Sequence, residues 1–167
     1  MRTIGLIGGM SYEGSLVYYR GLNQAINSSL GGLHSAQVML HSVDFQRIVE
    51  MQKSGRWSEA GDYLANVARS LERSGADCVA ICAVTMHLVA DAVAAATPLP
   101  FIHIVDVVAQ RLIEAKHYRP LLIATRYTME NGFYPTRMKG QGIDVIVPDE
   151  QDRNAIHTII FEELSLG

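Results

Sequence analysis

The chain has 167 residues, of which 49% are hydrophobic and 19% charged, and its net charge is −3 at pH 7. This length suits one domain, or one domain and part of a second, with a core that needs neither disulfides nor a metal. The charge excludes the basic surface of a nucleic-acid-binding protein and the polybasic arm of a membrane-surface protein.

The N-terminus and the cysteine content predict a cytoplasmic protein. Met1-Arg2-Thr3-Ile4 enters a strand pattern at once, without the features of a signal peptide. No apolar run approaches the roughly 18 residues of a membrane-spanning helix. Two cysteines suit a reducing compartment. We therefore expect neither a nucleic-acid nor a membrane partner.

Strand-like and helix-like segments alternate along the whole chain. Apolar runs between turn residues predict strands at 3–7, 36–40, 77–82, 101–104, 121–125 and 144–147. Helical periodicity predicts helices at 10–29, 43–51, 58–74, 86–96, 106–115 and 149–164. Strands that are apolar throughout, separated by helices, are typical of an α/β fold, here a parallel-sheet, Rossmann-like three-layer sandwich.

The turn Tyr118-Arg119-Pro120 is the best candidate for a domain boundary. We expect an N-terminal α/β domain over residues 1–116. Residues 117–167 would then form an incomplete second α/β domain.

Polar side chains follow four of the predicted strands, at the edge where parallel α/β sheets bind ligands. The segments are Gly8-Gly9-Met10-Ser11, His41-Ser42-Val43-Asp44, Cys82 with Thr85-Met86-His87, and Thr125-Arg126-Tyr127-Thr128. The strands themselves carry almost no such groups, so this edge is the predicted site.

Cys82 is the most reactive candidate in these segments. It ends a buried strand, and the start of a following helix would stabilise its thiolate. The competing interpretation is a small buried hydrophobe, the commonest fate of a free cysteine. His87, five residues later, either polarises this site or packs against its neighbours.

Three further groups have both a binding and a structural interpretation. Ser11 and the backbone N–H groups beside it either hold a carboxylate or form a plain turn. Thr125 and Thr128 either bind an anion or cap a helix, and Asp44 either contacts substrate or is an N-cap.

No cofactor or metal is predicted. The first loop lacks the spacing of a dinucleotide fingerprint and the end of a P-loop. No lysine ends a strand to anchor pyridoxal phosphate. The six histidines lack the spacing of a metal site.

Five blocks, in order, resemble the aspartate/glutamate racemase family, most closely its bacterial broad-specificity branch. They are Ile4-Gly5-Leu6-Ile7-Gly8-Gly9-Met10-Ser11-Tyr12-Glu13, Leu33-His34-Ser35-Ala36-Gln37, His41-Ser42-Val43-Asp44-Phe45, Cys82 with Thr85-Met86-His87, and Thr125-Arg126-Tyr127-Thr128-Met129-Glu130. The resemblance covers the whole chain.

The resemblance implies a cofactor-independent racemase with two similar α/β domains and its active site in the cleft between them. One cysteine removes the Cα proton as a thiolate and another returns a proton from the opposite face. Cys82 matches the first of these cysteines. The expected substrate-binding residues are Met10, Ser11, Asp44, Val84, Thr85, Thr125 and Thr128. A homodimer is also implied.

The chain departs from the family pattern in two places. The family reads Cys-Thr-Asn-Thr-Met-His where this chain has Ala83-Val84, so Val84 removes an amide that would bind substrate. The second family cysteine belongs to a Gly-Cys-Thr-Glu segment beyond the last residue here. Cys78 cannot replace it, because Cys78 lies four residues before Cys82, roughly 13 Å away along the strand.

Three functions therefore remain open. The first is an amino-acid racemase, truncated at its C-terminus. The second is a degenerate protein that binds acidic amino acids without catalysis. The third is a single-cysteine enzyme of the same superfamily, such as a decarboxylase or isomerase.

Overall fold

The computed structural model describes residues 1–167 without a gap. The chain folds into two compact units. Unit 1 comprises Met1–Ala83 and Val89–Ile102, and unit 2 comprises Val84–Leu88 and His103–Gly167. None of the helices combines the length and the apolar character that crossing a membrane requires.

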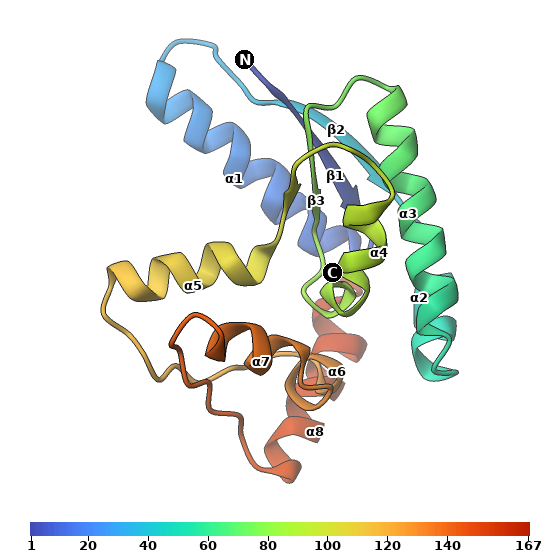
Figure 1. The fold of residues 1–167 in the computed structure, drawn as a ribbon, viewed down its shortest axis with the longest axis vertical. Helices are drawn as coiled ribbons and strands as arrows, with labels where there is room; N and C mark the ends of the chain where they lie inside the picture. The colour runs from blue at the N-terminus through green and yellow to red at the C-terminus, as the bar shows by residue number, and fades with distance from the viewer. The chain divides into compact units, whose positions relative to one another are not determined.

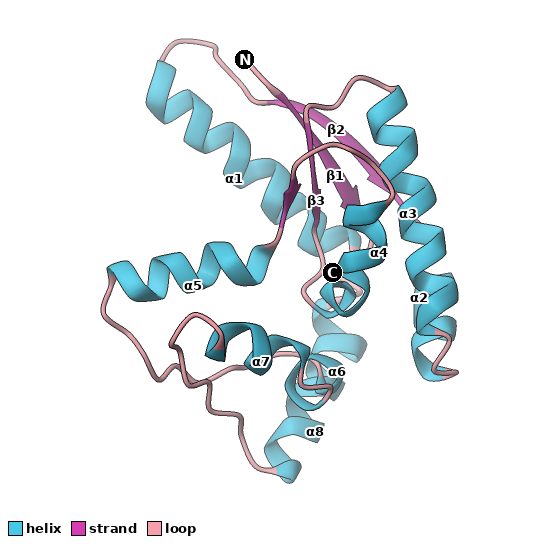
Figure 2. Ribbon diagram, in the orientation of Figure 1, coloured by secondary structure: helices cyan, strands magenta, loops and turns pink.

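A parallel four-stranded sheet forms the centre of unit 1 (Figures 1 and 2). Its strands are β1 (Thr3–Gly8), β2 (Gln37–Ser42), β3 (Cys78–Ile81) and β4 (Phe101–Ile102), in the spatial order β2-β1-β3-β4. Leu6 of β1 lies opposite Leu40 of β2 and Ala80 of β3. The predicted α/β fold with a parallel sheet is confirmed.

Helices cover both faces of this sheet. On one face, Tyr18 and Leu22 of α1 (Tyr12–Leu30) pack against Leu6 and Ala80. On the other face lies α3 (Trp57–Arg73), so close that a Cβ on Gly5 would meet Leu71 Cβ at 3.3 Å. The three layers follow from the alternation of side chains along β1.

Two shorter helices, α2 (Phe45–Lys53) and α4 (Ala90–Ala95), complete unit 1. The 3₁₀ helix η1 (Thr85–Val89), of which all but Val89 belongs to unit 2, directly precedes α4 in the chain. The predicted helix over 86–96 is therefore two elements, η1 and α4. Gly61 of α3 allows α4 to approach, because a Cβ there would lie 3.3 Å from Ala92 Cβ.

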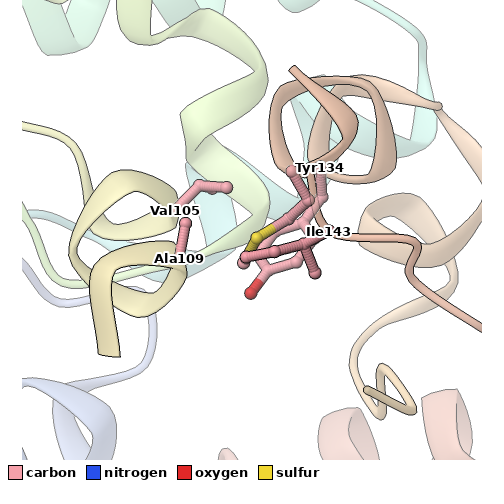
Figure 3. Packing of buried hydrophobic residues seen from close by; sticks show 5 residues of the cluster. Val105, Ala109, Tyr134 and Ile143 are labelled. Carbon is pink, nitrogen blue, oxygen red and sulfur yellow. The ribbon is translucent and has the colours of Figure 1, made fainter. Parts of the chain in front are cut away.

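Unit 2 is built mainly from helices. They are α5 (Ile104–Glu114), α6 (Arg126–Glu130), α7 (Phe133–Lys139), α8 (Glu150–Ile159) and the π-helical segment η2 (Ile160–Leu164). Val105 and Ala109 of α5 pack against Tyr134, Met138 and Ile143 to form the core of this unit (Figure 3). The guanidinium of Arg137 also binds the carboxylate of Asp106, at 2.6 and 2.7 Å.

The predicted strands at 121–125 and 144–147 are wrong. The two segments run parallel, with Leu122 N–H donating to Ile146 O at 2.8 Å, but only Leu121 and Ile146 form a regular bridge. An isolated pair of short segments has no neighbouring strand to extend its ladder.

The predicted boundary after residue 116 does not coincide with the division into compact units. Helix α5 lies before that boundary, yet Val105 and Ala109 pack against Tyr134 and Met138, which lie after it. The assignment of domains to 1–116 and 117–167 stays a prediction.

Candidate functional site

Cys82 lies directly beyond the C-terminal end of β3. Its N–H donates to Ile7 O at 2.9 Å, which continues the hydrogen bonding of the sheet past Ile81. The side chain is 7% exposed and packs with Leu6, Ala80 and Tyr18. The sheet therefore fixes the position of this thiol.

Burial raises the pKa of the Cys82 thiol from its ordinary value of 9.0 to about 12. This direction is opposite to the one expected for a thiolate at a helix N-terminus. Apolar neighbours disfavour the charged form, and the helix that follows is a short 3₁₀ segment that begins at Thr85. At neutral pH Cys82 is consequently a thiol.

The loop after β1 is held by internal hydrogen bonds. Ser11 Oγ accepts from Gly14 N–H at 3.3 Å and so caps α1. Ser15 Oγ accepts from Gly9 N–H at 2.8 Å and donates to Ser11 O at 2.9 Å. Ser15 was not predicted as a site residue, although a serine one helical turn after the N-cap is a recognisable signal.

This loop is a neighbour of Cys82. A Cβ on Gly14 would lie 3.9 Å from both Cys82 O and Ser11 Oγ. Gly9 has a φ of +88°, and a side chain there would collide with the backbone of Val43. Met10, between Gly9 and Ser11, is 8% exposed.

Asp44 acts as the N-cap of α2. Its Oδ1 accepts from Gln46 N–H at 3.1 Å, which matches the structural one of the two roles predicted for it. Nearby, the guanidinium of Arg47 lies over the ring of Tyr63, 4.2 Å from the centroid.

Three threonine hydroxyls meet in unit 2. Thr85 Oγ1 lies 2.7 Å from Thr125 Oγ1 and 3.1 Å from Thr128 Oγ1, and the last two are 3.2 Å apart. Thr128 is fully buried, and Thr125 also caps α6 by accepting from Thr128 N–H. The structure thus brings together residues that lie 40 positions apart.

The segment that carries Thr85 is anchored on both sides of it. Val84 packs against the unit 2 core around Val105. His87 Nε2 accepts from Ile104 N–H at 3.3 Å, and its ring meets that of His103 edge-on with centroids 4.7 Å apart. Both imidazoles are at least nine-tenths buried.

The predicted site residues thus fall into two sets. Unit 1 holds Met10, Ser11, Asp44 and Cys82, while unit 2 holds Val84, Thr85, Thr125 and Thr128. The first set offers a thiol proton, and the second offers hydroxyl groups that can donate to a carboxylate. No group of three His, Cys, Asp or Glu side chains is placed to hold a metal ion.

Comparison with known families gives one match over nearly the whole chain. The model of the Asp/Glu/hydantoin racemase family matches residues 7–165.

Solved structures give the same result. A proposed Asp/Glu racemase from Yersinia pestis is 48% identical, with a TM-score of 0.91. An aspartate racemase homologue from Pyrococcus horikoshii is 32% identical, with a TM-score of 0.86. In both cases the match covers 100% of this chain and 73% of the other. The aspartate racemase of Picrophilus torridus, at 19% identity and a TM-score of 0.77, shares the fold.

Proposed function

The chain belongs to the Asp/Glu/hydantoin racemase family and is by that membership an amino-acid racemase, and we propose that it inverts Cα of an acidic amino acid, with Cys82 as one of two proton-transferring groups. The observation that carries this proposal is the position of Cys82. It is held by the sheet at the C-terminal end of β3, beside the loop of Met10 and Ser11.

Inversion of a stereocentre requires a base on one face of the carbon and an acid on the other. As a thiol, Cys82 gives its proton to the Cα carbanion while the opposite group holds the proton removed from the substrate. In the reverse direction Cys82 must accept the Cα proton as a thiolate. The ammonium group of a bound substrate would favour that thiolate, because an adjacent positive charge lowers a thiol pKa.

Cys78 is not the opposite group. It begins β3, four residues before Cys82, and so lies roughly 13 Å from it along one strand. Its pKa is also raised, first by burial and then by the charge of Asp77. The proposal therefore assigns one of the two proton-transferring groups, and Cys78 provides an internal control.

The hydroxyls of Thr85, Thr125 and Thr128 are the proposed donors to a substrate carboxylate. They have three protons in total and already make three mutual contacts, so a bound carboxylate must compete with these contacts. Met10, Ser11 and Asp44, all in unit 1, are proposed as further substrate-binding residues. The hydrogen bonds by which Ser11 caps α1 and Asp44 caps α2 would hold these two residues in place.

Solvent exchange tests the chemistry directly. In deuterium oxide, the protein should exchange the Cα proton of aspartate or glutamate and racemise one of them. Cys82→Ser should abolish exchange, while Cys78→Ser should retain it. Exchange that survives in Cys82→Ser, or is lost equally in both variants, would overturn the assignment of Cys82.

A second candidate function is binding of an acidic amino acid without catalysis. It is favoured by Val84, which packs against the apolar core of unit 2 at the position where the family has an amide. Calorimetric binding of aspartate or glutamate without Cα exchange would establish this function instead.

Val84→Asn tests the effect of the lost amide. A restored polar contact is worth about 1–3 kcal/mol, so substrate affinity should rise by roughly 5- to 150-fold. Val84→Ala, which adds no polar group, is the matched control. Equal affinity in the two variants would show that residue 84 does not contact substrate.

A further inference from the structure

Ser15 is a buried residue of α1 whose hydroxyl group makes two hydrogen bonds to the loop after β1. Its Oγ accepts from Gly9 N–H at 2.8 Å and donates to Ser11 O at 2.9 Å, and the residue is 2% exposed. The two bonds end on either side of Met10, so one side-chain atom holds the backbone before and after it. Capping of α1 does not require this hydroxyl, because Ser11 Oγ already accepts from Gly14 N–H.

Two glycines make room for this hydroxyl and for the loop. A Cβ on Gly8 would lie 2.7 Å from Ser15 Oγ and 3.1 Å from Ser15 Cβ. A Cβ on Gly9 would lie 2.8 Å from Ser42 Oγ, at the end of β2. Any side chain at these two positions would therefore displace the loop from either Ser15 or β2. The pair of glycines and Ser15 form one arrangement, which fixes the path of the chain from β1 into α1.

The helix that carries Ser15 also contacts Cys82. Tyr18 lies three residues after Ser15, on the same side of α1, and packs against the buried cluster that contains Cys82. Gly14 directly precedes Ser15, and a Cβ on it would lie 3.9 Å from Cys82 O. The first turns of α1 thus contact both the loop and the strand end that bears the thiol, and all of these groups belong to unit 1.

We propose that Ser15 is a positioning residue, which holds the loop of Met10 and Ser11 in a fixed position relative to Cys82. It acts through the loop, since the one proton of its hydroxyl is already donated to Ser11 O. The catalytic consequence rests on the proposed function, in which Cys82 exchanges a proton with substrate Cα. Such a transfer depends on the alignment of the reacting atoms, and a displacement of about 1 Å can lower its rate about 100-fold.

Alkylation of Cys82 tests the positioning without reference to catalysis. In the full chain carrying Cys78→Ser, Cys82 is the only thiol, and its reaction with iodoacetamide can be followed by mass spectrometry. Ser15→Ala removes both hydrogen bonds, so the loop should loosen and the reaction should accelerate roughly 10-fold. The matched control is Ser29→Ala, the same substitution at an exposed position of α1, and it should react at the wild-type rate. An unchanged rate in Ser15→Ala would overturn the proposal.

Hydrogen exchange separates a local effect from a general loss of stability. In Ser15→Ala, exchange at Gly9 N–H should accelerate roughly 10-fold, because this N–H loses its acceptor. Exchange at Val79 N–H, which donates to Pro100 O within the sheet, should stay within about 2-fold of the wild type. Equal acceleration at both sites would show that Ser15 only stabilises the fold.

Racemisation kinetics test the consequence for catalysis. In Ser15→Ala, kcat should fall roughly 10- to 100-fold with a smaller change in KM, and Ser15→Thr, which keeps the hydroxyl, should restore most of the loss. An unchanged kcat, or a change confined to KM, would contradict a positioning role. A wild-type chain that racemises neither aspartate nor glutamate would overturn the proposed function instead, and the alkylation rates would still decide whether Ser15 fixes the loop beside Cys82.

Discussion

The side chains around Cys82 favour the neutral thiol over the thiolate. Leu6, Ala80 and Tyr18 surround the thiol, and burial holds its pKa at about 12. The proposed proton-transferring group is thus a neutral thiol when no positive charge lies beside it. This environment protects the thiol from oxidation, since the thiolate is the reactive form.

The raised pKa of Cys82 makes the folded state sensitive to alkali. The unfolded thiol loses its proton near pH 9, whereas the folded thiol keeps it to about pH 12. Between these values the folded state binds more protons, so stability falls as pH rises, by at most about 1.4 kcal/mol per pH unit. Urea unfolding at pH 8 and pH 10.5 should show that the wild type loses about 2 kcal/mol more than Cys82→Ala. Equal losses would show that Cys82 is not ionised on unfolding in this range.

Individual contacts of the site differ in how far the sequence reveals them. The caps formed by Asp44 and Thr125 follow from residue type and position, and capping is one of the two roles that the sequence predicts for each. The contact between Thr85 and Thr125 could not be derived from spacing, because it depends on tertiary packing across 40 residues. Ser15 is an intermediate case. It was not predicted as a site residue, but its hydrogen bond with Gly9 is local in the sequence.

Among the elements, α5 depends on a cap from a distant residue. His103 is its N-cap residue but makes no cap bond with its own side chain. His87, on η1, accepts the hydrogen bond from Ile104 N–H instead. This bond ties the start of α5 to the segment that carries Thr85, so helix capping and the threonine cluster are linked.

Removing the imidazole acceptor should loosen the first turn of α5. His87→Leu leaves the N–H of Ile104 without this partner, at a cost of about 1 kcal/mol. Hydrogen exchange at Ile104 should accelerate roughly 5-fold, as measured by NMR. His87→Gln retains an acceptor and should exchange more slowly than His87→Leu. Unchanged exchange in both variants would mean that water replaces the imidazole without cost.

The sequence predicts the type of an element correctly where its hydrophobic pattern extends over enough residues to show a period. The helix at 58–74 and the strand at 3–7 match α3 and β1 closely, because each buries a continuous apolar face. α6 and α7 were not predicted, since five and seven residues are too few to show a helical period. The segments at 121–125 and 144–147 have strand composition but only each other as partners.

At the scale of the whole molecule, the chain passes between the two units three times, after Ala83, Leu88 and Ile102. Val84–Leu88 belongs to unit 2, although unit 1 residues precede and follow it. When unit 2 unfolds, Val84–Leu88 therefore loses its packing. This segment continues into Cys82 through Ala83 on one side and into α4 through Val89 on the other. We expect the two units to unfold as one cooperative system.

A substitution in the core of unit 2 tests this coupling, because the only tryptophan of the chain, Trp57, is in α3 of unit 1. Met138 is fully buried in the core of unit 2, and Met138→Ala should cost about 2–5 kcal/mol. Since a chain of this size loses about 2–4 °C per kcal/mol, the midpoint temperature of the unfolding transition seen by Trp57 fluorescence should fall by roughly 4–20 °C. Lys139→Ala, on the exposed side of α7, should change this midpoint temperature by no more than about 2 °C. A Trp57 transition that stays unchanged in Met138→Ala, while the helical circular dichroism signal melts earlier, would show that the units unfold separately despite their three connections.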